Sequence, residues 1–110
     1  MKKTKIVMPK ITKDMWRIGT LYNDLCIYLS DEENTTLHIN KYGKSYYIKL
    51  VDLFKDLSED DKIIGIYVDD KQQTVFISFE KTGVYYAKVS DKKLYKSNRW
   101  TLLNNENEVK

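Results

Sequence analysis

Short apolar segments separated by polar breaks run through almost the whole chain, and this rhythm most constrains the fold. From Met15 to Trp100, runs rich in Val, Ile, Leu and Tyr alternate with polar residues. Apolar–polar alternation with a period of two residues predicts β-strands. The predicted strands are Lys5–Ile11, Trp16–Tyr22, Leu25–Leu29, Thr36–Asn40, Ser45–Leu50, Ile63–Val68, Thr74–Phe79, Val84–Val89 and a last extended piece over Leu94–Leu103, broken at Ser97-Asn98.

The breaks between these strands are short and contain turn residues. Lys41-Tyr42-Gly43-Lys44 and Lys81-Thr82-Gly83 each hold a glycine that can take a positive φ. Breaks of this length predict antiparallel hairpins, because a parallel crossover needs a dozen or more residues. We therefore expect a mainly β chain, a small single-domain antiparallel barrel or sandwich of about six to nine short strands. The alternative is an α+β chain, an antiparallel sheet with one helix on one face.

One segment departs from the strand pattern. Leu50, Leu53, Phe54 and Leu57 are spaced at i, i+3, i+4 and i+7, which is typical of one face of an amphipathic helix. We predict one short helix near residues 50–58. A helix of about two turns does not persist in isolation, so it must pack on the sheet.

Length and composition predict one domain. We expect residues 1–103 to form it, because 110 residues with 42% apolar content suffice for a single core, and 104–110 to be a disordered polar tail. Cys26 is the only cysteine, which excludes an intramolecular disulfide. No stretch approaches the roughly 20 apolar residues of a membrane helix, and the N-terminus lacks the apolar run of a secretory signal. These features predict a soluble, cytoplasmic protein that does not contact a membrane.

The alternation divides the strands into two faces. The apolar face predicts the core: Leu25, Ile27, Leu29, Leu37, Ile39, Tyr46, Ile48, Leu50, Ile64, Ile66, Val68, Val75, Ile77 and Phe79. The opposite face carries aromatic side chains: Tyr28, His38, Tyr47, Tyr67, Phe76 and either Tyr85 or Tyr86. This face either packs against another layer of the fold or, where it is open, forms a recognition surface, because tyrosine brings a large contact area at low entropic cost.

The residues of catalytic and metal sites are scarce. His38 is the only histidine, and a nucleophilic pair with Cys26 would need a chance alignment of two strands. A zinc site needs three or four ligands at workable spacing. Asp70 followed by Glu80-Lys81 is similar to the acidic-x-Lys pattern of metal-dependent nucleases but lacks the spacer residue, so the lysine would point to the wrong face. We expect no enzyme activity, no cofactor and no metal.

The charge distribution suggests a function. The net charge is +5 over residues 1–20, −6 over 21–80 and +4 over 81–110. A surface formed by the acidic residues of this middle segment can occupy the basic groove of a nucleic-acid-handling protein, because the groove attracts carboxylates as it attracts phosphate. We therefore predict a small non-catalytic protein that binds a protein partner with a basic surface, as inhibitors carried by phages and mobile elements do. The predicted contact residues are Asp60, Asp61, Tyr67, Asp69 and Asp70.

Two alternatives remain open. In the first, the chain is a single-stranded nucleic-acid-binding β domain, a role that lysines and exposed aromatics support and the acidic middle weakens. Its phosphate contacts would be Lys10, Arg17, Lys88, Lys92 and Arg99, and its stacking residues Trp16 and Trp100. In the second, the chain is a structural subunit of a homo-oligomeric assembly, such as a homodimer, formed through exposed strand edges.

Overall fold

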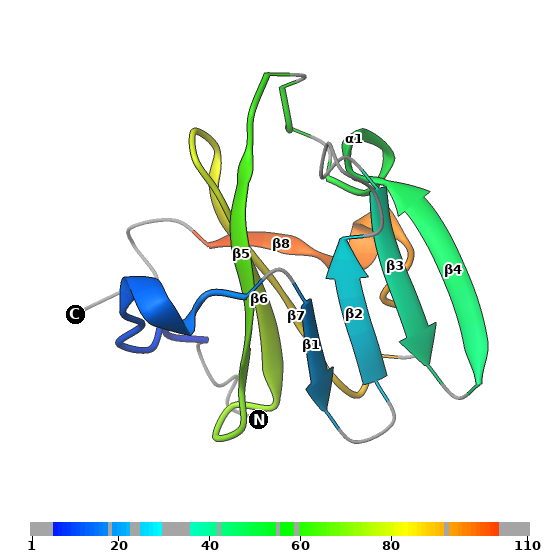
Figure 1. The fold of residues 1–110 in the computed structure, drawn as a ribbon, viewed down its shortest axis with the longest axis horizontal. Helices are drawn as coiled ribbons and strands as arrows, with labels where there is room; N and C mark the ends of the chain where they lie inside the picture. The colour runs from blue at the N-terminus through cyan, green and yellow to red at the C-terminus, as the bar shows by residue number, and fades with distance from the viewer. Residues whose placement is uncertain are drawn as a thin grey trace, which may run out of the picture.

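The computed structural model describes residues 6–17, 19–22, 25–29, 36–41, 43–54, 56–58, 60–91 and 93–103. In these ranges the chain forms two four-stranded antiparallel sheets, each with its strands in sequence order (Figure 1). The first sheet contains β1 (Gly19–Tyr22), β2 (Leu25–Leu29), β3 (Thr36–Lys41) and β4 (Lys44–Lys49). The second contains β5 (Ile63–Asp69), β6 (Thr74–Phe79), β7 (Gly83–Lys88) and β8 (Thr101–Leu103). The predicted mainly β, antiparallel fold is confirmed, and the arrangement is sandwich-like.

The observed elements agree with most predicted bounds. β2 and β6 match their predicted ranges residue for residue, and the last extended piece is broken by a 3-10 turn at Ser97–Arg99. The predicted glycine turns also form, since Gly43 and Gly83 have φ angles of 78° and 118°. The helix α1 is shorter than expected and spans Leu50–Leu53. The predicted tail, residues 104–110, lies outside the described residues.

The prediction of a first strand over Lys5–Ile11 is wrong for its described part, residues 6–11, which belongs to no strand. Pro9 lacks a backbone N–H and cannot complete a ladder. A side chain replaces the partner strand: the Val7 N–H donates to Gln72 Oε1 over 2.9 Å, and Gln72 Nε2 donates to the Val7 carbonyl over 2.7 Å. The segment Ile6–Arg17, called the N-terminal arm below, contains a 3-10 turn at Lys13–Met15.

The core lies between the two sheets. Its buried side chains come from both sheets, from α1 and from the segment after β7: Leu25, Ile27, Leu29, Leu37, Ile39, Leu50, Leu53, Phe54, Ile66, Val75, Ile77, Phe79, Tyr85, Ala87, Leu94 and Trp100. Phe54 is at its centre, and its ring contacts those of Phe79, Tyr85 and Trp100 at centroid distances of 4.6 to 5.3 Å. The predicted apolar stripe of the helix is therefore confirmed as a core element.

One predicted core residue is exposed instead. Ile64 has 52% of its surface exposed, because the pairing of β5 with β6 shifts register between Ile63 and Gly65. A bulge of this kind moves the alternation by one residue. Ile63 consequently packs against the core in place of Ile64.

A short backbone bridge connects the N-terminal arm to the second sheet just before the chain enters the first. The Arg17 N–H donates to the Ile66 carbonyl over 3.0 Å, and the Ile66 N–H donates to the Arg17 carbonyl over 2.7 Å. A Cβ atom at Gly65 would lie 2.5 Å from the Trp16 Cβ. Glycine at this position therefore allows the arm to approach β5.

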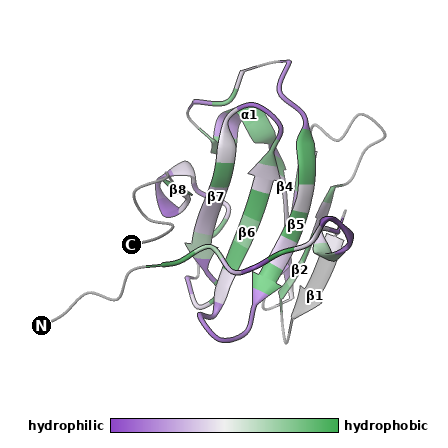
Figure 2. Cartoon of the chain, turned by 90° about the vertical axis from the view of Figure 1, so that its left-hand side faces the viewer, coloured by the Kyte–Doolittle hydropathy of each residue, from purple (hydrophilic) through white to green (hydrophobic). Residues whose placement is uncertain are grey.

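The N-terminal arm covers the outer face of the second sheet. Figure 2 shows it crossing in front of β5 and β6. Ile6 packs with Phe76 and Leu103 in a second apolar cluster, which also includes Met8, Trp16, Tyr67, Val84 and Tyr86. As a result, every residue of β6 is buried. On this sheet, the predicted aromatic face packs against another layer.

Candidate functional site

A row of aromatic side chains crosses the outer face of the first sheet. The strand register places Tyr28 opposite His38, and His38 opposite Tyr47. The rings of His38 and Tyr47 are stacked at a centroid distance of 4.2 Å, and the ring of Tyr28 meets that of His38 edge-on at 4.5 Å. Tyr47 has 65% of its surface exposed, whereas His38 beneath it has only 6%. We call Tyr28, His38 and Tyr47 the aromatic row.

A glycine on β1 allows this strand to lie close to the Tyr28 end of the aromatic row. Gly19 lies opposite Tyr28, and a Cβ atom at Gly19 would lie 2.4 Å from the Tyr28 Cβ. Any other residue there would push the two strands apart. The absence of a side chain at Gly19 therefore leaves space for the Tyr28 side chain on the outer face.

His38 is only partly satisfied by hydrogen bonds. Its Nδ1 shares a hydrogen bond with the Tyr28 hydroxyl. Partial burial is the main cause that raises the pKa of Tyr28 above 10.0, and the nearby Tyr47 and Cys26 side chains add to it. The Tyr28 phenol is therefore protonated at neutral pH. The Nε2 atom of His38 is buried and has no hydrogen-bond partner in the described structure. In either tautomer, one polar atom of the imidazole is therefore left unsatisfied beneath Tyr47.

The surface around the aromatic row is almost uncharged. Strand alternation places Cys26, Asn40 and Ser45 on the same face, and Asn40 Nδ2 donates to Ser45 Oγ over 3.1 Å. Lys49 is the one charged side chain among the described outer-face residues of β2, β3 and β4. This face combines aromatic rings and small hydrogen-bonding groups, a composition common in protein-binding loops of antibodies.

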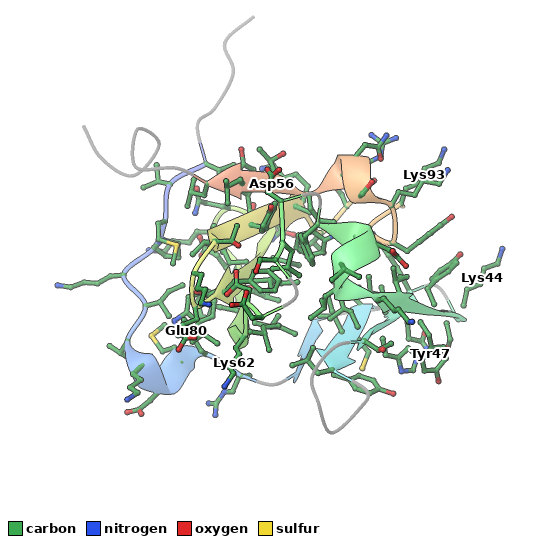
Figure 3. All side chains as sticks on the ribbon, turned by 90° about the horizontal axis from the view of Figure 1, so that it is seen from above. Lys44, Tyr47, Asp56, Lys62, Glu80 and Lys93 are labelled. Atoms are coloured by element: carbon green, nitrogen blue, oxygen red, sulfur yellow. The ribbon has the colours of Figure 1, made fainter. Side chains whose placement is uncertain are left out.

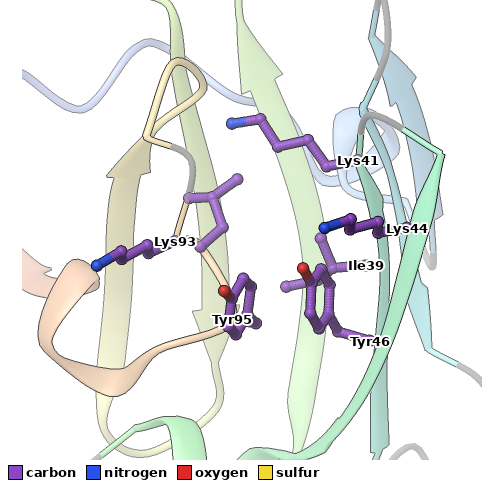
Figure 4. A pocket seen from close by; sticks show the side chains of 7 residues that line it. Ile39, Lys41, Lys44, Tyr46, Lys93 and Tyr95 are labelled. Carbon is purple, nitrogen blue, oxygen red and sulfur yellow. The ribbon is translucent and has the colours of Figure 1, made fainter.

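A basic pocket opens at the side of the sandwich, between β4 and the turn after β7 (Figure 4). It has a volume of about 280 Å³ and is lined by Ile39, Lys41, Lys44, Tyr46, Lys93, Leu94 and Tyr95. Tyr46 and Tyr95 are stacked at a centroid distance of 3.8 Å. Figure 3 shows Lys44 and Lys93 on the same side of the molecule as Tyr47.

The structure does not bring the two predicted acidic pairs together. Asp60-Asp61 precede β5 and Asp69-Asp70 end it, so the seven-residue strand separates them by about 20 Å. Tyr67 lies between them along the strand, half-buried, with its ring 6.4 Å from that of Trp16. These residues do not form one continuous acidic surface.

Three of the four acidic side chains have contacts within the fold, and for Asp61 and Asp69 these contacts include backbone N–H donors. Asp61 accepts hydrogen bonds from the backbone N–H groups of Lys81 and Thr82 over 2.8 and 2.9 Å, and one from the Thr82 hydroxyl. Asp69 is buried and accepts from Gln72 Nε2 over 2.7 Å, which orients the glutamine that holds the N-terminal arm. Asp70 is exposed, and Asp60 forms an ion pair with Lys81 at 2.6 Å.

Several of the residues predicted to contact nucleic acid have contacts within the fold instead. Trp100 is buried in the core and donates from Nε1 to the Leu94 carbonyl over 2.5 Å, and Trp16 is half-buried against Tyr67. Arg99 forms an ion pair with Asp91 at 3.7 Å. Lys10 and Arg17 are exposed on the N-terminal arm, and Lys88 donates to the Gln72 carbonyl over 3.1 Å. Lys92 lies outside the described residues.

No model of a known protein family matches the chain, and comparisons with curated proteins and with solved structures give no match. Within the described residues, no group of three or more His, Cys, Asp or Glu side chains is placed to hold a metal ion. The described helices are also too short to cross a membrane.

The contacts of Asp61 lead to a prediction about stability. Replacing Asp61 with alanine leaves the Lys81 and Thr82 donors without their acceptor, and we expect the free energy of unfolding to fall by about 2 kcal/mol. Urea denaturation measures this change. The matched control, Asp70→Ala, removes an exposed carboxylate, and it should change stability by less than about 0.5 kcal/mol. Equal effects of the two substitutions would contradict this role of Asp61.

The Asp61 carboxylate should also make the stability of the fold depend on pH. Burial raises the pKa of Asp61, but the hydrogen bonds from the Thr82 hydroxyl and from the Lys81 and Thr82 N–H groups outweigh it, and the net pKa lies below 3.8. A folded-state pKa below the unfolded value gives stability that is present above about pH 4 and is lost as pH falls through the folded pKa. In acid titrations followed by circular dichroism, Asp61→Asn should therefore lose less stability below about pH 4 than the wild type does.

Proposed function

We propose that this chain is a non-catalytic binding protein and that its partner, another protein, docks on the outer face of the first sheet. The observation that carries the proposal is the contrast between the two outer faces. The chain's own N-terminal arm covers the second sheet, whereas Tyr47 on the first sheet is 65% exposed at the end of the aromatic row. A large exposed tyrosine supported by stacked neighbours is typical of interface hot spots.

The chemistry of this face favours a protein over a nucleic acid. Nucleic acids are bound largely through phosphate neutralisation by lysine and arginine. The described outer face of β2, β3 and β4 has only Lys49 as a charged residue, at its border. Its uncharged side chains suit a protein surface that offers hydrogen-bonding groups and apolar area. Binding on this face should therefore depend little on salt.

The more specific prediction, an inhibitor that offers an acidic surface to a nucleic-acid-handling protein, is the second candidate. Its support is now restricted to the exposed carboxylates of Asp60 and Asp70, since Asp61 is half-buried, Asp69 is buried, and both accept hydrogen bonds within the fold. The Lys81 ammonium and the Ser58 hydroxyl lower the pKa of Asp60 to about 2, so this group is ionised at any physiological pH. A basic partner would bind it in a salt-dependent way.

The proposal is tested by affinity capture from the native host lysate, with nuclease treatment, followed by affinity measurements on the captured protein. We expect the partner to be retained after nuclease treatment and Tyr47→Ala to weaken binding at least tenfold, or about 1.4 kcal/mol. Val51→Ala is the matched control, because Val51 is also exposed but lies on α1. Loss of the partner on nuclease treatment, or unchanged binding of Tyr47→Ala, would refute the proposal.

Two further arms separate the alternatives. If the charge reversals Asp60→Lys and Asp70→Lys weaken binding and Tyr47→Ala does not, the partner engages the acidic residues. A solution mass of about 26 kDa for the free protein, twice its chain mass of 13.1 kDa, would indicate a dimer. If Tyr47→Ala reduces this mass to that of the monomer, the partner on this face is a second copy of the chain, as in the structural-subunit alternative.

A further inference from the structure

The basic pocket between β4 and the turn after β7 is a second, chemically different site. We propose that it binds a small organic phosphate, a phosphate monoester with a compact apolar body. This proposal does not rest on the aromatic row, since the pocket is lined from the inner faces of β3 and β4 and from the segment 93–95.

The charge of the pocket favours an anion. Three of its described lining residues are lysines, and none of the described ones is acidic. Lys41 and Lys44 lie opposite each other across the β3–β4 hairpin. Lys93 lies on the other side of the opening, and its ammonium group points away from those of Lys41 and Lys44 (Figure 4). The nearby Asp91 carboxylate is occupied, since it accepts from the Lys93 N–H over 2.9 Å and pairs with Arg99 at 3.7 Å.

The pocket is held together by a buried lysine. The Lys41 side chain is buried, and its Nζ donates to the carbonyls of Val89 and Asp91 over 2.5 and 2.6 Å. These bonds join β3 to the turn after β7 across 48 and 50 residues of sequence. The two sides of the pocket, β3 and the turn after β7, are therefore fixed relative to each other. The positive charge of the Lys41 side chain is in place before a ligand binds.

The remaining lining residues match the other parts of such a ligand. Ile39 and Leu94 are buried and give the pocket an apolar floor. A hydrogen bond with the Tyr95 hydroxyl, followed by partial burial, raises the pKa of Tyr46, so the Tyr46 phenol is protonated at neutral pH. The Tyr46 and Tyr95 rings are stacked at a centroid distance of 3.8 Å at the pocket, and a phenol O–H can donate to an anion.

A phosphate monoester fits this lining better than a carboxylate does. It has a charge of about −1.5 to −2 at pH 7 and three acceptor oxygens. Lysine ammonium groups bind phosphate as point charges, whereas the bidentate recognition of a carboxylate usually requires arginine. The volume of about 280 Å³ is at the lower end for small-molecule sites, which limits the ligand to a compact body.

The test uses phenyl phosphate as the probe and follows backbone amide chemical shifts of the full chain in 50 mM salt. We expect saturable shifts at residues of β3, β4 and the segment 93–95, with binding at least fivefold tighter than that of benzoate, which has the same ring and a carboxylate. The double variant Lys44→Gln, Lys93→Gln should weaken phenyl phosphate binding at least tenfold. Lys49→Gln is the matched control, because Lys49 is on β4, as Lys44 is, but points to the outer face of the sheet. This substitution should change the affinity for phenyl phosphate less than twofold.

Three results would overturn the proposal. The first is the lack of saturable shifts at the pocket with 10 mM phenyl phosphate. The second is binding of benzoate as tight as that of phenyl phosphate, which would remove the preference for phosphate. The third is tighter binding of a ten-nucleotide single strand than of phenyl phosphate at the same residues, which would assign the site to nucleic acid instead.

Discussion

Replacing Phe54 with alanine should lower the free energy of unfolding by about 3–5 kcal/mol, the usual cost of truncating a buried phenylalanine. Phe54 has 1% of its surface exposed, and its ring contacts three other aromatic rings contributed by β6, β7 and the segment before β8. Its removal would leave a cavity where α1 closes the sandwich, and the aromatic neighbours are too large to collapse into it. A loss of this size is a large share of the roughly 5–15 kcal/mol that stabilises a typical domain.

Urea denaturation followed by tryptophan fluorescence measures this effect, since Trp100 contacts the Phe54 ring. Phe54→Leu preserves most of the volume and should cost about 1–2 kcal/mol, so it remains measurable if the alanine variant does not fold. Val51→Ala, on the exposed side of α1, should cost less than about 0.5 kcal/mol. If Phe54→Ala and Val51→Ala had similar stabilities, the ring would not be a central core contact.

Replacing Gly65 with alanine should cost about 1–3 kcal/mol through overpacking. The added Cβ would lie 2.5 Å from the Trp16 Cβ, and 3.1 and 3.2 Å from the Arg17 backbone nitrogen and oxygen. Backbone atoms cannot rotate away as a flexible side chain can. We therefore expect the bridge between Arg17 and Ile66 to open and the N-terminal arm to separate from β5.

Two measurements distinguish this local opening from a general loss of stability. Amide hydrogen exchange of Arg17 and Ile66 should become much faster in Gly65→Ala, while exchange in the β2–β3 pair changes in proportion to global stability only. The neighbouring substitution Ile64→Ala truncates an exposed side chain and should leave the bridge intact. Unchanged protection of Arg17 and Ile66 in Gly65→Ala would show that the close approach at this glycine is not required.

The candidate site was only partly predictable. Strand alternation placed Tyr28, His38 and Tyr47 on one face, and the register confirms that they are neighbours. The openness of that face depends on where the N-terminal arm lies, and the arm covers the other sheet through contacts of Ile6 with Phe76 and Leu103. Contacts between residues so far apart in sequence leave no local signal.

The basic pocket was missed, although one signal was present. Continuing the inward alternation of Leu37 and Ile39 places Lys41 on the core side, where a lysine needs a special environment. Its partners are carbonyls of Val89 and Asp91, which no pattern near residue 41 reveals. The acidic residues show the same limit, because Asp61 is adjacent to Asp60 in sequence but accepts hydrogen bonds from the β6–β7 turn.

Local patterns along the chain specified the strands, the hairpins and most of the core, because the two-residue alternation and the turn glycines act over a few neighbouring residues. Thr74–Phe79 and Leu25–Leu29 were predictable for that reason. Long-range packing set the bulge that exposes Ile64, the covering of one sheet by the arm, and the placement of Lys41, Lys44 and Lys93 around one pocket. These features depend on which distant segments pack together, and that packing is selected by the free energy of the whole fold.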